Sequence, residues 1–63
     1  MSRLKEMRES KGLSQSQLAR ESGVNVRMIQ HYEQGVRDIN RAEAETVLRL
    51  ADALGCDVRE IMN

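Results

Sequence analysis

Aromatic residues are almost missing from this chain of 63 residues, because Tyr32 is the only one. Its hydrophobic core must therefore be built from Leu, Ile, Val, Met and Ala. Proline is absent, and no Pro-, Gly- or Ser-rich linker divides the chain. Cys56 is the only cysteine, which excludes an internal disulfide and fits a reducing compartment.

Long apolar runs are missing as well. None approaches the roughly 18 residues that a membrane span needs, and the amino-terminal residues lack the apolar stretch of a signal peptide. We therefore expect a cytoplasmic protein without a membrane partner. Its length and its hydrophobic (40%) and charged (32%) fractions indicate one globular domain spanning residues 1–63.

The net charge is zero, but the charges are distributed unevenly. Residues 1–41 hold eight basic and five acidic residues, whereas residues 42–63 hold two basic and five acidic ones. A neutral molecule can thus carry a basic face that suits nucleic acid. Ordinary solvated charge explains the same asymmetry, so it does not decide between the two.

Glycines and capping residues divide the chain into five expected helices, and no segment alternates with the period of a strand. The helices are expected near residues 2–11, 14–22, 26–34, 40–54 and 57–62. Glycines stop the first four, and the expected caps are Ser14 with Gln17, Asn25, Asn40 with Glu43, and Asp57 with Glu60. The fourth helix has an apolar stripe of Ala44, Val47, Leu48, Ala51 and Leu54. The sequence therefore predicts an all-α fold, a compact five-helix bundle.

The third expected helix has two different faces. Ile29 and Tyr32 point to one side, and the opposite face carries Arg27, Gln30, His31 and Gln34, with neither an apolar nor an acidic residue. Arginine pairs with guanine, glutamine pairs with adenine, and histidine donates to a base edge. A solvated outer face is the alternative, but the face lacks the glutamate and lysine that usually provide one. The pattern favours a helix that enters a DNA groove with its first turn.

The chain resembles the helix-turn-helix domain of the phage Cro and repressor proteins, the XRE family. The matching residues are Arg8, Lys11-Gly12-Leu13-Ser14-Gln15, Gln17-Leu18-Ala19, Gly23-Val24, Ile29, Tyr32-Glu33, Gly35, and Ala51-Asp52-Ala53-Leu54-Gly55. The resemblance implies a lambda-repressor-like bundle in which helices two and three form the helix-turn-helix. It also implies binding to operator DNA, usually by a two-fold dimer.

The candidate DNA-contacting residues follow from the polar face and from this resemblance. Expected base contacts come from Val26, Arg27, Gln30 and His31. Expected contacts to the DNA backbone come from Ser14, Gln15, Asn25, Gln34, Arg37 and Arg41. Gln15 is also expected to brace the third helix. The segment 36–46 is longer than the usual family pattern and has Ile39 where proline is frequent, which leaves the role of Arg41 open.

Arg8 has a structural explanation. It lies on the apolar stripe of the first helix, where a charge is costly unless it is paired. Glu33 borders the apolar face of the third helix, and the family often pairs these two positions. We therefore expect an ion pair between Arg8 and Glu33.

Other chemistry finds little support in the sequence. His31 is the only histidine, so a metal site with three or four converging ligands is not expected. No base is placed to activate Cys56, and no phosphate-binding glycine loop is present. We expect neither an enzyme nor a cofactor.

The sequence thus predicts a sequence-specific regulator of transcription, a repressor that binds double-stranded DNA as a homodimer. The alternative is a protein-interaction module, such as an antitoxin or an adaptor, which the neutral net charge and the acidic residues 42–63 favour. Val58 and Ile61 are expected in the core, with some neighbouring apolar surface left for self-association.

Overall fold

The computed structural model describes residues 2–63, and within that range every regular element is helical. The elements are α1 (Arg3–Ser10), α2 (Gln15–Ser22), α3 (Val26–Gln34), the 3₁₀ helix η1 (Ile39–Arg41), α4 (Ala44–Leu54) and the 3₁₀ helix η2 (Val58–Glu60). The predicted all-helical fold is confirmed. The expected bundle of five helices is corrected to four α-helices, because the last element is a single 3₁₀ turn instead of a fifth α-helix.

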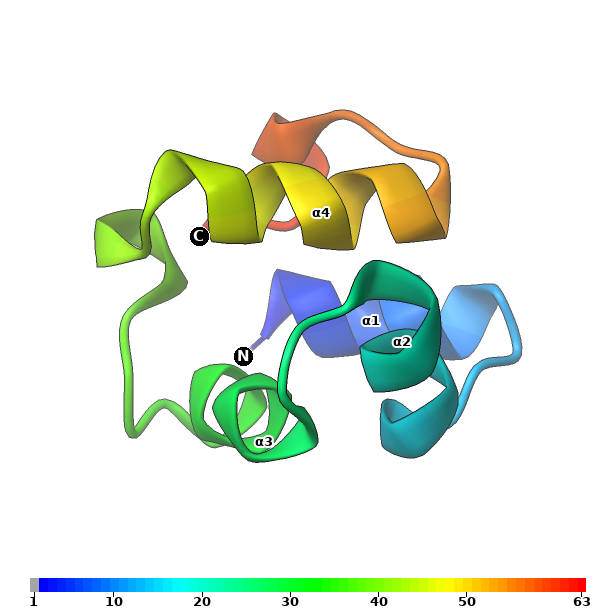
Figure 1. Cartoon of the computed structure of the whole chain (residues 1–63). Coiled ribbons are helices and arrows are strands. Elements are labelled where there is room, and N and C mark those ends of the chain that lie inside the picture. Colours follow the sequence, from blue (N-terminus) through cyan, green and yellow to red (C-terminus); the bar gives the residue numbers. More distant parts are fainter. Residues whose placement is uncertain (1) are drawn as a thin grey trace.

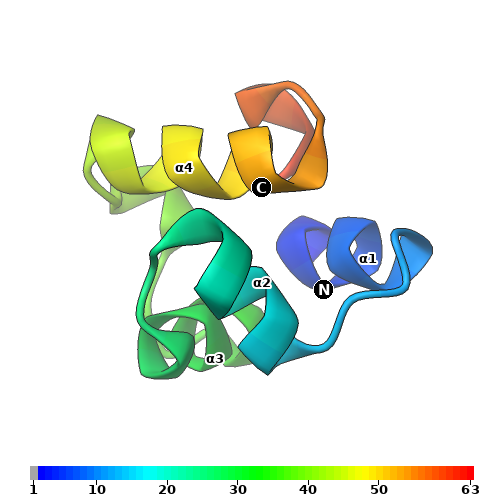
Figure 2. The same cartoon turned by 45° about the vertical axis from the view of Figure 1, so that its right-hand side comes forward.

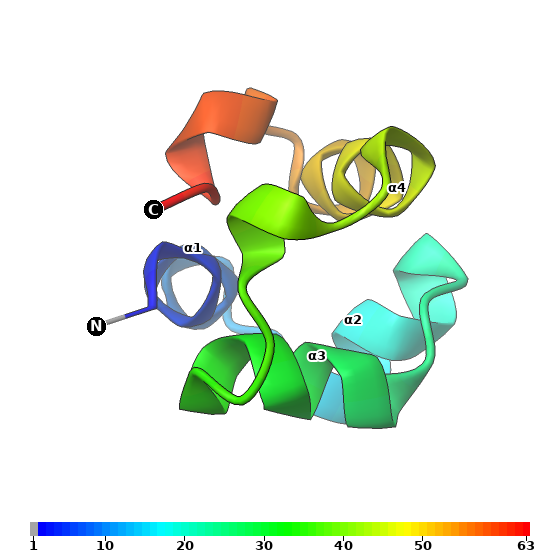
Figure 3. The same ribbon diagram turned by 90° about the vertical axis from the view of Figure 1, so that its left-hand side faces the viewer.

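The four α-helices are arranged so that α3 and α4 lie on opposite sides of the molecule (Figures 1 and 2). Helix α2 packs against both of them, α1 packs against α3, and η2 packs against α4 and α1. No other element lies beyond α3 on its outer side in Figures 1 and 3. The domain measures 24 × 20 × 20 Å.

Three of the four expected caps are present. The Ser14 hydroxyl accepts from the Gln17 N–H, and the Gln17 side chain accepts from the Ser14 N–H, which completes the capping box of α2. The Asn25 side chain accepts from the Arg27 N–H at the start of α3. Asp57 and Glu60 form the same reciprocal pair at η2. Each cap satisfies main-chain N–H groups that lack partners inside the helix.

The fourth cap, the expected box of Asn40 and Glu43, is wrong. Asn40 lies inside η1, whose own cap is Asp38, and the Asp38 carboxylate accepts from the Asn40 N–H. Glu43 is the N-cap of α4 but makes no side-chain cap bond. The physical reason is that an additional 3₁₀ turn between α3 and α4 contains Asn40, so α4 begins only after Glu43.

The core is aliphatic and contains Tyr32 as its only ring. Its most deeply buried side chains are Leu4, Leu18, Ile29, Ile39, Leu50 and Ile61. The expected stripe of α4 needs correction, because Leu48 is 52% exposed and Ala44 is exposed, whereas Leu50 is fully buried. Both stripes satisfy helical spacing, and packing against α2 and η2 selects the one centred on Leu50. Val58 is half-buried and Ile61 is buried.

No helix within residues 2–63 has both the length and the apolar character that a membrane crossing requires.

Candidate nucleic-acid interface

A tight turn fixes helix α3 against helix α2. Gly23 ends α2 with a positive φ of +75°, which a side chain would strain. A Cβ atom at this position would also lie 3.2 Å from Nη1 of Arg49 on α4. The buried Ser22 hydroxyl accepts from the Val24 N–H, so the turn is satisfied internally. Together these contacts hold the first residues of α3 in one orientation.

Helix α3 buries one face and exposes part of the other. Ile29 is fully buried and Tyr32 is 6% exposed, as the sequence predicts. On the outer face, Arg27 is exposed at the beginning of the helix and Gln34 is exposed at its end. The expected base-reading residues Val26, Gln30 and His31 are partly buried. The outer face is therefore available to a ligand, and Arg27 is the exposed member of the expected base-reading set.

The His31 ring has one buried nitrogen. Its Nδ1 atom is buried and has no hydrogen-bond partner within residues 2–63. A ligand that approaches α3 from outside can therefore meet only the Nε2 side of this ring. Nε2 suits a single hydrogen bond to a base edge or a phosphate.

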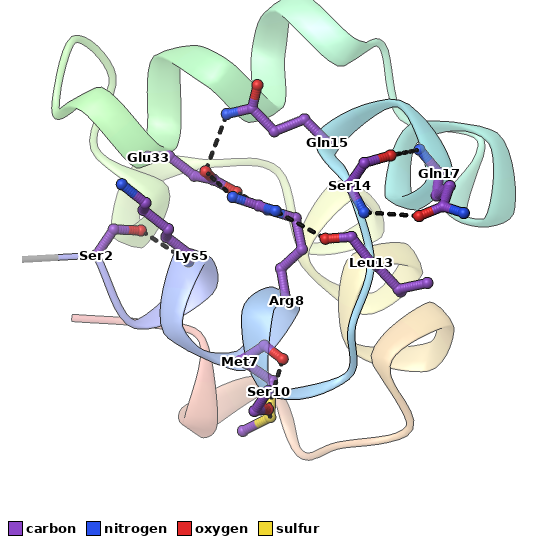
Figure 4. A network of polar contacts seen from close by, with 10 residues as sticks. All are labelled: Ser2, Lys5, Met7, Arg8, Ser10, Leu13, Ser14, Gln15, Gln17 and Glu33. Carbon is purple, nitrogen blue, oxygen red and sulfur yellow. Dashed lines mark hydrogen bonds and ion pairs between the residues drawn. The ribbon is translucent and has the colours of Figure 1, made fainter.

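A buried polar network joins α1, α2 and α3 (Figure 4). Arg8 Nε donates to Glu33 Oε2 at 2.7 Å, and Arg8 Nη2 donates to Glu33 Oε1 at 3.0 Å, so the expected ion pair is present. Arg8 Nη1 donates to the Leu13 carbonyl at 2.7 Å. The hydrogen bond to Glu33 raises the pKa of Arg8 above its ordinary value, although burial opposes that shift. The guanidinium therefore stays charged in this site.

Gln15 joins the same network from the first turn of α2. Its Nε2 donates to Glu33 Oε1 at 3.0 Å. This bond provides the expected brace between α2 and α3. It also occupies one of the two amide hydrogens of Gln15, which leaves the second for an external acceptor such as a phosphate.

The other expected backbone-contacting residues near the turn are also in use as caps. The Ser14 hydroxyl and the Asn25 side-chain oxygen accept main-chain bonds, as described above. Both residues are exposed. The Ser14 hydroxyl hydrogen and the Asn25 side-chain NH₂ group remain as donors.

Two exposed arginines follow α3: Arg37 lies in the loop after it, and Arg41 is the last residue of η1. Gly35 ends α3 with a positive φ of +79°, and the N–H groups of Val36 and Arg37 both donate to the His31 carbonyl. The loop then enters η1, where Ile39 is buried. The arginines are thus held on an ordered segment next to the carboxyl end of α3.

The ion pairs leave most of the unpaired basic side chains in residues 3–41. Arg49 and Arg59, the two bases of residues 42–63, are paired with Glu45 and Asp57. Of the bases in residues 3–41, only Arg8 has a carboxylate partner. Unpaired positive charge is therefore concentrated in the part of the chain that contains the helix-turn-helix, and such charge is what a phosphate backbone attracts.

No group of three or more His, Cys, Asp and Glu residues within residues 2–63 is arranged to hold a metal ion. Burial raises the pKa of the half-buried Cys56 thiol, and the nearby Glu60 carboxylate raises it further. A nucleophilic cysteine needs the opposite shift.

The sequence did not predict the pair of hydrogen bonds that joins Asn40 to Asn63. These residues lie far apart in the chain, and no local spacing indicates that they meet.

Comparison with known proteins gave two matches. A family model described as helix-turn-helix matches residues 4–61. The crystal structure of the restriction-modification controller protein C.AhdI from Aeromonas hydrophila superposes with a TM-score of 0.81. The two sequences are 40% identical, and the match covers 92% of this chain and 83% of that chain. A comparison with curated proteins gave no significant match.

Proposed function

The chain belongs to the helix-turn-helix family of Cro- and repressor-type regulators, and from this premise we propose that it reads one operator in double-stranded DNA. In the proposed complex, α3 lies in the major groove with its first turn deepest. Val26, Arg27, Gln30 and His31 face the base edges. This assignment depends above all on Arg27, which is exposed and free of any carboxylate within residues 2–63.

Contacts to the DNA backbone come from both ends of the helix-turn-helix. Ser14 and Gln15 lie at the start of α2, Asn25 lies at the start of α3, and Gln34, Arg37 and Arg41 lie at or beyond the end of α3. Phosphate oxygens accept hydrogen bonds from neutral donors and from unpaired guanidinium groups. These residues position α3, and the base contacts select the sequence.

The proposed DNA-binding unit is a homodimer. An apolar groove runs along α4 and η2 and is lined by Ala42, Ala44, Val47, Leu48, Val58 and Met62. This groove lies on elements across the molecule from α3, so a second copy seated there leaves α3 free (Figure 1). Both charge signs occur on α4 and η2, which permits a two-fold pairing without net repulsion. Two α3 helices about 34 Å apart then read two half-sites on one face of the duplex.

The proposed biological role is repression by occupying a promoter. The similarity to a restriction-modification controller protein suggests that the regulated genes belong to a restriction-modification system. An antitoxin or adaptor role is the second candidate. The same apolar groove favours it, because a different protein can cover Leu48 as well as a second copy can.

Selection of bound duplexes from a random pool tests this function. A two-fold symmetric motif is the expected product, and a promoter that contains the motif should be silenced in a reporter assay by this protein. A Lys5→Ala variant serves as a control for the loss of one positive charge, because Lys5 is exposed on α1, outside both the expected DNA contacts and the apolar groove. Absence of any duplex binding at low salt, together with a stable complex with another protein, would replace the DNA-binding proposal by the second candidate.

A further inference from the structure

The Asn40 side chain and the Asn63 main chain form a reciprocal pair of hydrogen bonds. Asn40 Nδ2 donates to the Asn63 carbonyl at 2.5 Å, and the Asn63 N–H donates to Asn40 Oδ1 at 2.8 Å. The side-chain amide of Asn40 therefore bonds both main-chain polar groups of Asn63 through its nitrogen and its oxygen. Neither bond caps a helix, so helix formation does not explain the pair.

The segment Met62–Asn63 is held on its other side by the start of α1. The Arg3 N–H donates to Asn63 Oδ1 at 3.3 Å, and Arg3 Nη1 donates to the Met62 carbonyl at 3.3 Å. Figure 3 shows this red segment between η1 and the first turn of α1. Asn63 thus connects η1 to α1, and its main-chain and side-chain groups serve different neighbours.

The pair lies at the far end of the loop that carries Arg37, within the same 3₁₀ turn as Arg41. The loop is fixed at its beginning by the bonds from Val36 and Arg37 to the His31 carbonyl. Its residues 35–38 are exposed, so few packing contacts restrain them. At its end, the anchors are buried Ile39 and the pair formed by Asn40 with Asn63. Arg41 follows Asn40 directly.

We propose that the Asn40 side chain is a positioning group for DNA binding, because its two hydrogen bonds to the Asn63 main chain hold Arg37 and Arg41 at the phosphate backbone. This inference rests on the proposed function. The pair fixes η1 before DNA arrives, so less conformational entropy is lost when the arginines bind phosphate. Its contribution is to affinity for any duplex, and the choice of sequence by α3 is unaffected.

Two substitutions distinguish the effect of the bonds between Asn40 and Asn63 from the effect of the bond between Arg3 and Asn63. Asn40→Ala removes both bonds. Asn63→Ala is the matched control, because it retains the main-chain groups that bind Asn40 and removes only the bond from Arg3. We expect Asn40→Ala to weaken binding to a non-operator duplex about threefold to tenfold, the size expected for one or two hydrogen bonds. The dependence on salt should become shallower, whereas the selected motif and the melting temperature should change little. Asn63→Ala should bind as the wild type does.

A second experiment distinguishes positioning from direct contact of Asn40 with phosphate. Asn63→Pro removes the main-chain N–H that donates a hydrogen bond to Asn40 Oδ1, and it leaves the Asn40 side chain intact. If the two residues act as a pair, Asn40→Ala and Asn63→Pro should each weaken binding, and the double variant should be no worse than Asn40→Ala. In the free protein, the amide NMR signals of Arg37 and Arg41 should move in Asn40→Ala and stay in place in Asn63→Ala.

The outcomes are distinct. Wild-type affinity and salt dependence in Asn40→Ala overturn the inference while the proposed function stands. Additive losses in the double variant also overturn it, because they assign Asn40 a phosphate contact of its own. Failure of the wild-type protein to bind any duplex removes the proposed function itself, and the positioning role with it.

Discussion

Arg8 and Glu33 form a two-pronged ion pair across the interface between α1 and α3, with Nε and Oε2 2.7 Å apart. The two side chains are 10% and 2% exposed. Glu33 also accepts from Gln15 on α2, so one carboxylate receives donors from two other helices. A buried charge of this kind is tolerated because its hydrogen-bonding capacity is used.

Removal of one partner should be severe. We expect Arg8→Ala to lower the free energy of unfolding by about 3 kcal/mol, because Glu33 is then left buried without its counter-ion. Denaturant unfolding followed by circular dichroism measures the change. Arg59→Ala is the matched control, because its ion pair is exposed and should contribute little. A double replacement, Arg8→Met with Glu33→Leu, should recover much of the stability. Equal stabilities of Arg8→Ala and the wild type would contradict the structural role of the pair.

Arg27→Ala should change which sequences are bound. Arg27 is the exposed residue at the start of α3, and a two-pronged arginine–guanine contact contributes about 1–3 kcal/mol of discrimination. Competition between the selected operator and single-base variants measures the reduced discrimination, which should be confined to particular base pairs. If the variant keeps the full operator preference, Arg27 is not a base-reading residue.

Arg37→Ala should weaken binding to all duplexes alike. Arg37 is exposed, and its guanidinium has no carboxylate partner in the described part of the chain, so a phosphate is its expected ligand. When affinity is measured against salt concentration, the slope should fall by about one for each phosphate that Arg37 no longer neutralises. The preference for the operator over other sequences should persist. A change in base preference would move Arg37 from the backbone to the base edges.

The Cys56 thiol should react slowly in the native protein. Burial raises its pKa above the ordinary value, the Glu60 carboxylate adds to that shift, and Lys11 opposes it. The reactive thiolate therefore forms only at higher pH, and the pH at which the reaction rate is half-maximal should exceed about 8.5, the value of a free cysteine. Reaction with a chromogenic disulfide across this pH range measures it, with urea-unfolded protein as the control. A midpoint below that of the unfolded protein would contradict the assignment.

Local signals in the sequence predicted most of the helix starts and ends. The caps at Ser14, Asn25 and Asp57 depend on bonds that span two or three residues, so they follow from short spacings. The phase of α4 was not predictable in this way. Leu48 and Leu50 both fit a helical stripe, and only the position of the packed neighbours decides which is buried.

The candidate interface shows the same division. The inner face of α3 and the need for a partner at Arg8 were predictable, because an apolar stripe and a charge within one are visible in the sequence. The resemblance to the family indicated Glu33 as that partner. The 3₁₀ turn at η1 and the bonds between Asn40 and Asn63 were not. They depend on where distant segments of the chain meet. The spacing of Asn40 and Glu43 matches that of a capping box, although no such box forms.

The exposed face of α4 is where we expect two copies of the chain to meet. Leu48 is 52% exposed beside the apolar groove of α4 and η2, so a charge there should oppose a contact between two copies. We expect Leu48→Asp to be monomeric in sedimentation analysis at concentrations where the wild type is a dimer. Val36→Asp is the matched control, because Val36 is 66% exposed but lies in the loop after α3, outside the groove.

The Leu48→Asp monomer should retain its helical spectrum, because position 48 is outside the core. It should also bind an operator with two half-sites far more weakly, because each α3 then binds alone without the gain from linkage. Dimers of equal stability in Leu48→Asp and the wild type would place the seam elsewhere on the molecule.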